Sequence, residues 1–117
     1  MRKINKVFIN APIFDILNNN EQTFASLSTE IRTHNIEAVA PSLNMRASTI
    51  ESYKDFAMKQ LTRALLACDI MVTHGDWHEF KECKTLNLIA RELNIPVIHH
   101  VRLNEVLTAS KILPEND

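Results

Sequence analysis

The stretch GDWHEFKE, which begins at Gly75, holds the side chains best suited to bind or transform a ligand. Gly75 is the only glycine of the chain and Trp77 the only tryptophan, and Asp76, Glu79 and Glu82 supply carboxylates. A carboxylate accepts hydrogen bonds from hydroxyl and amine groups, and an indole can stack on a flat base. We therefore treat Gly75, Asp76, Trp77 and Glu79 as candidate ligand-binding residues.

Each of these residues also has a purely structural interpretation. A Gly-Asp pair is common in turns for backbone reasons alone. Trp77 could cap the edge of a sheet with its large apolar area. Glu79 and Glu82 are expected in the first turn of a helix, where the helix dipole favours carboxylates. The sequence leaves both interpretations open.

Histidines and cysteines surround the same stretch, and together they could suggest a zinc site. The set is His74, Asp76, His78, Cys83, His99 and His100. Because no pair has the Cys-x-x-Cys or His-Glu-x-x-His spacing of zinc proteins, we expect no metal ion, and no other cofactor is indicated. Cys68 and Cys83 are expected to be reduced, buried thiols rather than a disulfide.

Apolar patterns around this stretch predict alternating strands and helices. Strands are expected at residues 7–9, 38–40, 70–73 and 96–99. Helices are expected at residues 21–34, from residue 52 towards residue 68, at 80–93 and at 104–113. Ser52 and Asp55 resemble a capping box at the start of the second of these helices, and Asn104 is expected to cap the last one. The apolar residues expected to carry the second helix are Phe56, Leu61, Leu65 and Leu66. Residues 42–52 are expected to form a long loop.

Strands that alternate with helices of this length predict a doubly wound α/β fold. The sheet should be parallel, with four strands in the order 2-1-3-4 and helices on both faces. Ligands bind such sheets at the carboxyl ends of the strands, where the winding direction reverses. The candidate ligand-binding residues at this edge therefore also include Ala11, Pro12, Ile13 and Ser42.

Length and composition predict a single domain over residues 1–117, of which 45% are hydrophobic. The formal net charge is −1, so we expect no nucleic-acid partner and no membrane partner. No apolar run approaches the roughly 18 residues of a membrane span, and the start of the chain lacks the features of a signal peptide. A cytoplasmic location is therefore expected.

The chain resembles the nucleoside 2-deoxyribosyltransferase-like superfamily of small bacterial and phage domains. The resemblance rests on Ala11-Pro12 after a strand, on CDIMVTHGDW from Cys68, and on IARELNIPVI from Ile89, in this order and spacing. It covers nearly the whole chain. It implies a flavodoxin-like fold, a nucleoside or nucleotide ligand at the carboxyl edge, and a homo-oligomer.

One departure from the family bears on catalysis. Active members of the family are expected to carry a glutamate four residues before the alanine that matches Ala90, and Leu86 stands there. Leucine cannot attack an anomeric carbon. Glu82 lies one helical turn earlier, about 5.4 Å closer to the loop, and is the candidate catalytic residue if activity survives. Ala11 replaces a family glycine, which restricts how closely the backbone can approach a ligand.

Three functional classes follow. The chain could be a nucleoside- or nucleotide-binding domain without the glycosyl nucleophile, which is the class we favour. It could be an active N-glycosidase or deoxyribosyltransferase that uses Glu82 or Glu79. It could also be an oligomeric interaction module with a vestigial cleft. Asp69, which is retained together with the other family-like residues, is taken as evidence against a decayed cleft.

Overall fold

A computed structural model describes residues 3–12, 21–40 and 51–111 of the chain. In this part of the chain, four parallel strands form one sheet in the order β2-β1-β3-β4. The strands are β1 (Lys6–Asn10), β2 (Glu37–Val39), β3 (Ile70–Thr73) and β4 (Val97–His99). The predicted strand order is confirmed, and the arrangement is that of a flavodoxin-like α/β fold.

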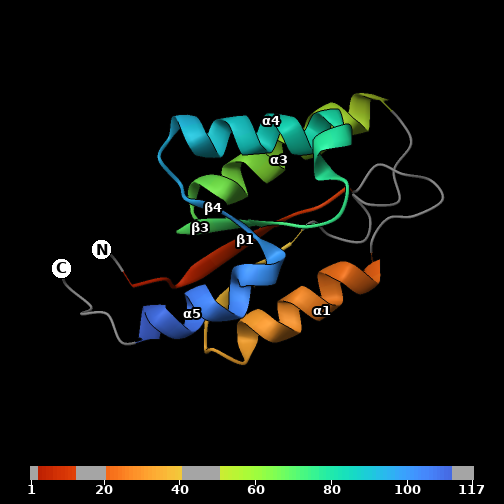
Figure 1. Ribbon diagram of the computed structural model, residues 1–117. Helices are drawn as coiled ribbons and strands as arrows, with labels where there is room; N and C mark the ends of the chain where they lie inside the picture. Colours follow the sequence, from red (N-terminus) through yellow and green to blue (C-terminus); the bar gives the residue numbers. More distant parts are fainter. Residues whose placement is uncertain (1–2, 13–20, 41–50, 112–117) are drawn as a thin grey trace.

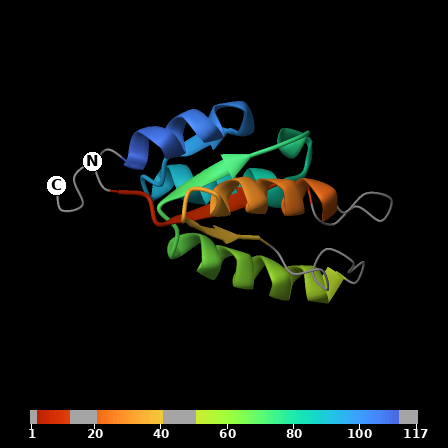
Figure 2. The same ribbon diagram turned by 90° about the horizontal axis from the view of Figure 1, so that it is seen from below.

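Helices cover both faces of the sheet, as predicted (Figure 1). One face carries α3 (Glu51–Leu66) and α4 (Lys81–Glu92). The other carries α1 (Glu21–Arg32) and α5 (Leu103–Lys111), which lie nearest the viewer in Figure 2. Two short 3-10 helices, η1 (Trp77–Glu79) and η2 (His100–Arg102), follow β3 and β4 at the carboxyl edge of the sheet.

The core lies on both faces of the two central strands. All four residues of β3 are buried, and Val7, Phe8 and Ile9 of β1 are at most 1% exposed. Continuous apolar runs are typical of strands covered on both sides. The edge strands β2 and β4 are shorter and only partly buried, so the central pair fixes the positions of the loops at its ends.

Two asparagines make the turns that lead from a helix into an edge strand. Asn35 follows α1 with φ 60°, and Asn94 follows α4 with φ 59°. Asparagine tolerates this left-handed conformation better than most residues. In each case an isoleucine comes next, and the amide of Ile95 donates to the carbonyl of Ala90 (2.8 Å), which closes the end of α4.

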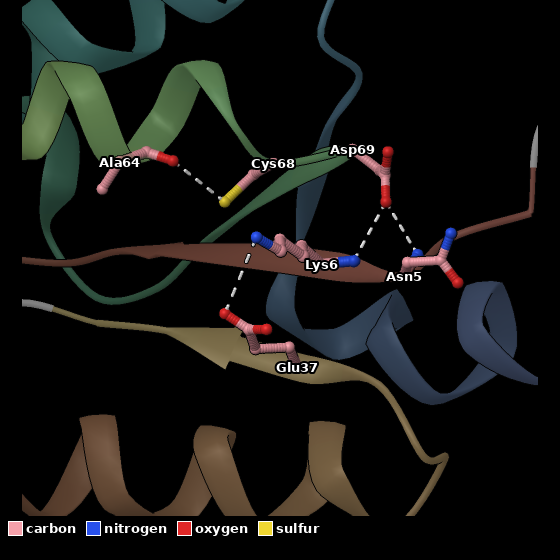
Figure 3. Close-up of polar contacts among 6 residues, drawn as sticks. All are labelled: Asn5, Lys6, Glu37, Ala64, Cys68 and Asp69. Carbon is pink, nitrogen blue, oxygen red and sulfur yellow. Dashed lines mark hydrogen bonds and ion pairs between the residues drawn. The ribbon is translucent and has the colours of Figure 1, made fainter.

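Asp69 joins the amino ends of the two central strands (Figure 3). Its Oδ2 accepts hydrogen bonds from the backbone amides of Asn5 (2.7 Å) and Lys6 (2.9 Å). Lys6 Nζ also lies 4.0 Å from Glu37 Oε2 of β2. The interpretation of Asp69 as part of a retained cleft was wrong, because a residue that precedes a strand lies at the amino edge, opposite the candidate site.

Several predicted helix boundaries differ from the structure. Helix α3 begins at Glu51, so Ser52 lies inside the helix rather than at its cap. Most of the expected loop at residues 42–52 lies outside the described residues. Helix α5 begins at Leu103, so Asn104 does not cap it. Of the apolar residues expected to carry α3, Leu61 and Leu65 are buried, whereas Phe56 and Leu66 are 54% and 55% exposed. Ala57 is buried as well. None of the helices within residues 3–12, 21–40 and 51–111 has the length and apolar character needed to cross a bilayer.

Candidate functional site at the carboxyl edge of the sheet

Strand register aligns three polar residues at the carboxyl edge. Asn10 of β1 pairs with Thr73 of β3, and Thr73 pairs with His99 of β4. Beyond this row the chain leaves the sheet, and the amide of His74 still donates to the carbonyl of Asn10 (3.2 Å). The loops after β1 and β3 therefore start side by side, as expected for the point at which the winding direction reverses.

The residues after β1 are only partly described. Ala11 is 3% exposed and Pro12 is buried, so both lie against the protein rather than in solvent. Ile13 and Ser42, the other two candidates on this side, lie outside the described residues.

The loop after β3 begins with a left-handed glycine. Gly75 has φ 68°, and no atom of the described residues lies within 4 Å of the position that a Cβ would occupy. Glycine is therefore required here for its backbone conformation rather than for space. Asp76 is exposed, and its carbonyl accepts from the amide of Glu79 (2.9 Å), which closes η1. Glu79 is exposed and lies in η1, not in the first turn of α4 as expected. Trp77 is half-buried.

Asn10 is the most unusual polar residue of this edge, because it is only 1% exposed. Its Nδ2 donates to the carbonyl of Cys83 in α4 (3.0 Å) and lies 3.5 Å from Met71 Sδ. These contacts orient the carboxamide, since the Cys83 carbonyl requires a donor. Asn10 Oδ1 is buried, and it has no hydrogen-bond partner among the described residues. Asn10 is not one of the residues predicted from the sequence, although an asparagine that ends an apolar strand is a signal that could have found it.

Glu82 lies beside the residue that Asn10 contacts. It is in the first turn of α4 and is partly buried, and its buried Oε1 also has no partner in the part of the chain that the structure describes. Leu86, one turn further along α4, is 3% exposed and belongs to the hydrophobic core. Leu86, which stands where the resemblance would place a glutamate, is thus a core side chain. Glu82 is the carboxylate of α4 nearest to the loop.

Three histidines form a cluster where β3 and β4 end. The ring of His100 lies 4.1 Å from that of His74 and 4.4 Å from that of His99, measured between centroids. Burial and the neighbouring His100 and His99 lower the pKa of His74. Burial and His99 lower the pKa of His100, against the opposing effects of Glu30 and of a hydrogen bond with the Thr73 backbone. Both imidazoles are therefore expected to be neutral at pH 7.

The residues that could have suggested a zinc site are only partly brought together. His74, His99 and His100 meet, whereas His78 is exposed beside Trp77, with ring centroids 6.0 Å apart. Among the described residues, no group of three or more histidine, cysteine, aspartate or glutamate side chains has an arrangement that could hold a metal ion.

Both cysteines are free and buried, as predicted. Burial raises the pKa of Cys68 to about 11 and raises that of Cys83 as well. Cys68 Sγ donates to the carbonyl of Ala64 (3.3 Å) near the amino edge (Figure 3). Neither thiol is therefore activated as a nucleophile.

Comparison of this chain with family models, with curated proteins and with solved structures gave no match. What the carboxyl edge can bind must therefore be inferred from its own residues and their geometry.

Proposed function

We propose that this chain is a nucleoside- or nucleotide-binding domain whose ligand lies across the carboxyl edge, between the loops after β1 and β3. The observation that carries the proposal is a pair of buried oxygens, Asn10 Oδ1 and Glu82 Oε1, for which residues 3–12, 21–40 and 51–111 supply no hydrogen-bond partner. Buried acceptors in folded proteins nearly always have a donor, so each unsatisfied one calls for an explanation. A ligand that donates hydrogen bonds would satisfy both.

The chemistry of the remaining side chains supports this class of ligand. Nucleosides carry hydroxyl groups on the sugar and amino or imino groups on the base, which are the donors that these oxygens lack. Trp77 is a half-buried indole at the same edge and offers an apolar face for a base. Asp76 is an exposed carboxylate in the same loop and can accept from a hydroxyl or amine. The resemblance described above supports the same ligand class.

A thermal-shift screen against nucleosides, nucleotides and sugar phosphates tests the proposal, because a ligand that binds only the folded state raises its apparent stability. Replacing Asp76 with alanine is expected to weaken binding by about 1–3 kcal/mol, the loss typical of a hydrogen bond to a charged group. His78→Ala is the matched control, since His78 is equally exposed in the same loop. Absence of saturable binding to the whole panel would refute the proposal.

The binding domain is proposed to lack N-glycosidase and deoxyribosyltransferase activity, because Leu86 is packed in the core. The alternative, an active enzyme, is favoured by one observation: Glu82 Oε1 is buried near the site and has no partner. Incubation with 2′-deoxynucleosides and their monophosphates, followed by measurement of free base, separates the two. Turnover by the wild type that disappears in Glu82→Gln would establish the enzyme and assign Glu82 as its nucleophile.

The reciprocal variant, Leu86→Glu, needs a folding control. Leu86 is 3% exposed, so a glutamate there would place an unpaired carboxylate in the core. Base release that appears only in a folded Leu86→Glu protein would support a surviving cleft that lacks its nucleophile. Glu79→Gln serves as the comparison for Glu82→Gln, because Glu79 is exposed in η1.

Homo-oligomerisation, the basis of the third class, is supported by the surface of α3 and α4. Leu66 is 55% exposed and Leu88 is 58% exposed, and a groove of about 390 Å³ lies between the two helices. Sedimentation velocity over a concentration series tests whether copies of the chain associate. A monomer throughout, with Leu88→Lys behaving identically, would contradict association through this surface.

A further inference from the structure

The histidine cluster at the carboxyl edge connects two segments that are far apart in the sequence. His74 begins the loop that carries Gly75 and Trp77, whereas His99 ends β4 and His100 begins η2. His100 occupies the centre, because its ring contacts both of the others. Through these ring contacts, the cluster connects the loop after β3 to the end of β4.

The neutral forms of these side chains suit this arrangement. His99 Nδ1 accepts a hydrogen bond from the amide of Val101 (3.4 Å) and so caps η2. This role as acceptor requires that His99 Nδ1 carries no proton. His100 Nδ1 is buried and has no partner in the described part of the chain, so a proton placed there would be buried without an acceptor among these residues.

The charged groups around the cluster offer little compensation for added positive charge. Among the described residues, Glu30 of α1 is the carboxylate that acts on His100. Asp76, in the loop itself, is exposed, and Arg102 of η2 is paired with Glu105 of α5 (3.6 Å). Protonated imidazoles at ring separations near 4 Å would repel one another, and a single partly buried glutamate cannot neutralise all of them.

We propose that His74, His99 and His100 form an acid-sensitive latch, which holds the loop after β3 against the end of β4 while His74 and His100 are neutral and releases the loop when they are protonated. Gly75 can act as the hinge of this loop, because a residue without a Cβ adopts both left-handed and right-handed backbone conformations at little cost. The latch does not depend on any ligand. It would also make ligand affinity at the proposed site fall in acid, because it controls the loop that carries Asp76 and Trp77.

Proton linkage gives the direction of the effect on stability. Folding lowers the pKa values of His74 and His100 from 6.5, so the unfolded chain binds protons more tightly than the folded chain. The stabilisation that comes from their neutral forms is complete above pH 6.5. It is lost progressively as the pH falls from there towards the lowered values. The latch should therefore open in this same interval.

Trp77 is the only tryptophan and lies in the controlled loop, so its fluorescence reports on the latch directly. We would record its emission in the ligand-free full chain between pH 8 and pH 5, with far-ultraviolet circular dichroism in parallel. A protonated His78 could quench Trp77 by itself, since their rings are 6.0 Å apart. His78→Gln removes this quencher and is the matched control for His100→Gln, which removes the centre of the cluster.

The latch predicts a transition below pH 6.5 that persists in His78→Gln and is lost in His100→Gln, with unchanged circular dichroism. His74→Gln gives a second test of the same loss if His100→Gln does not fold. The proposal is overturned if the wild type shows no transition, if His78→Gln abolishes it, or if the cluster variants retain it. It is also overturned if the circular dichroism changes together with the fluorescence, because the event would then be global unfolding.

Discussion

Replacing Asn10 with leucine separates a binding role of this residue from a structural one. Leucine has the same branching as asparagine, but it neither donates nor accepts. The variant loses the hydrogen bond from Nδ2 to the Cys83 carbonyl and at the same time removes the buried Oδ1 that has no partner. Asn10 is 1% exposed, so both effects occur away from solvent.

The two effects on the free energy of unfolding oppose one another. Loss of the hydrogen bond costs about 0.5–1.5 kcal/mol, and removal of an unsatisfied buried acceptor recovers about 1–3 kcal/mol. The larger methyl groups add a packing cost of about 1–3 kcal/mol. At the central values of these ranges, we expect Asn10→Leu to be about 1 kcal/mol less stable than the wild type in urea denaturation. It should nevertheless lose nucleoside binding.

Asn10→Asp is the matched comparison. It keeps the shape of the side chain but sets a carboxylate oxygen against the Cys83 carbonyl, which should cost about 3–5 kcal/mol, the penalty of an uncompensated buried charge. The proposed binding role of Asn10 Oδ1 is refuted if Asn10→Leu is destabilised as strongly as Asn10→Asp. Oδ1 would then be making a stabilising interaction in the free protein and would not be available to a ligand.

Three further predictions concern the loop, the amino edge and the thiols. Gly75→Ala should lower the free energy of unfolding by about 1–2 kcal/mol, the cost of a left-handed Cβ, with no added clash; a neutral result in urea denaturation would contradict the backbone assignment. Asp69→Ala removes the acceptor of two backbone amides and should cost about 1–3 kcal/mol without affecting ligand binding; weakened binding in a folded variant would argue against its purely structural role. Cys68 and Cys83 should react with Ellman's reagent at pH 8 only as fast as the chain opens, since both are buried and burial raises the pKa of each. A rapid reaction of either thiol without denaturant would contradict this expectation.

Much of the fold could be predicted because its strongest signals are local. Apolar runs at Val7 and at Ile70 are buried on both sides, and such strands must lie at the centre of a covered sheet. The intervening helices then imply parallel pairing and the observed strand order. The ends of helices were less predictable, because a residue such as Asn104 resembles a cap in sequence but lies inside α5.

The candidate site was predicted only in outline. The edge and its loops follow from topology, and Gly75 could be located because it is the only glycine. The partners of side chains could not be predicted, because they depend on which strands and helices meet. Asn10 meets Cys83, which lies 73 residues further along the chain, and His74 meets His100 through the pairing of β3 with β4.

The most direct test of the central claim is a two-dimensional ¹H–¹⁵N NMR titration of the full chain with the nucleosides and nucleotides of the screening panel. A ligand at the carboxyl edge should shift the amides of Ala11 and Gly75, the indole N–H of Trp77 and the side-chain amide of Asn10 in a saturable manner. The amides of Asn5 and Asp69, at the opposite edge, should be unaffected. No saturable shift with any ligand, or shifts confined to the groove between α3 and α4, would contradict the proposed function.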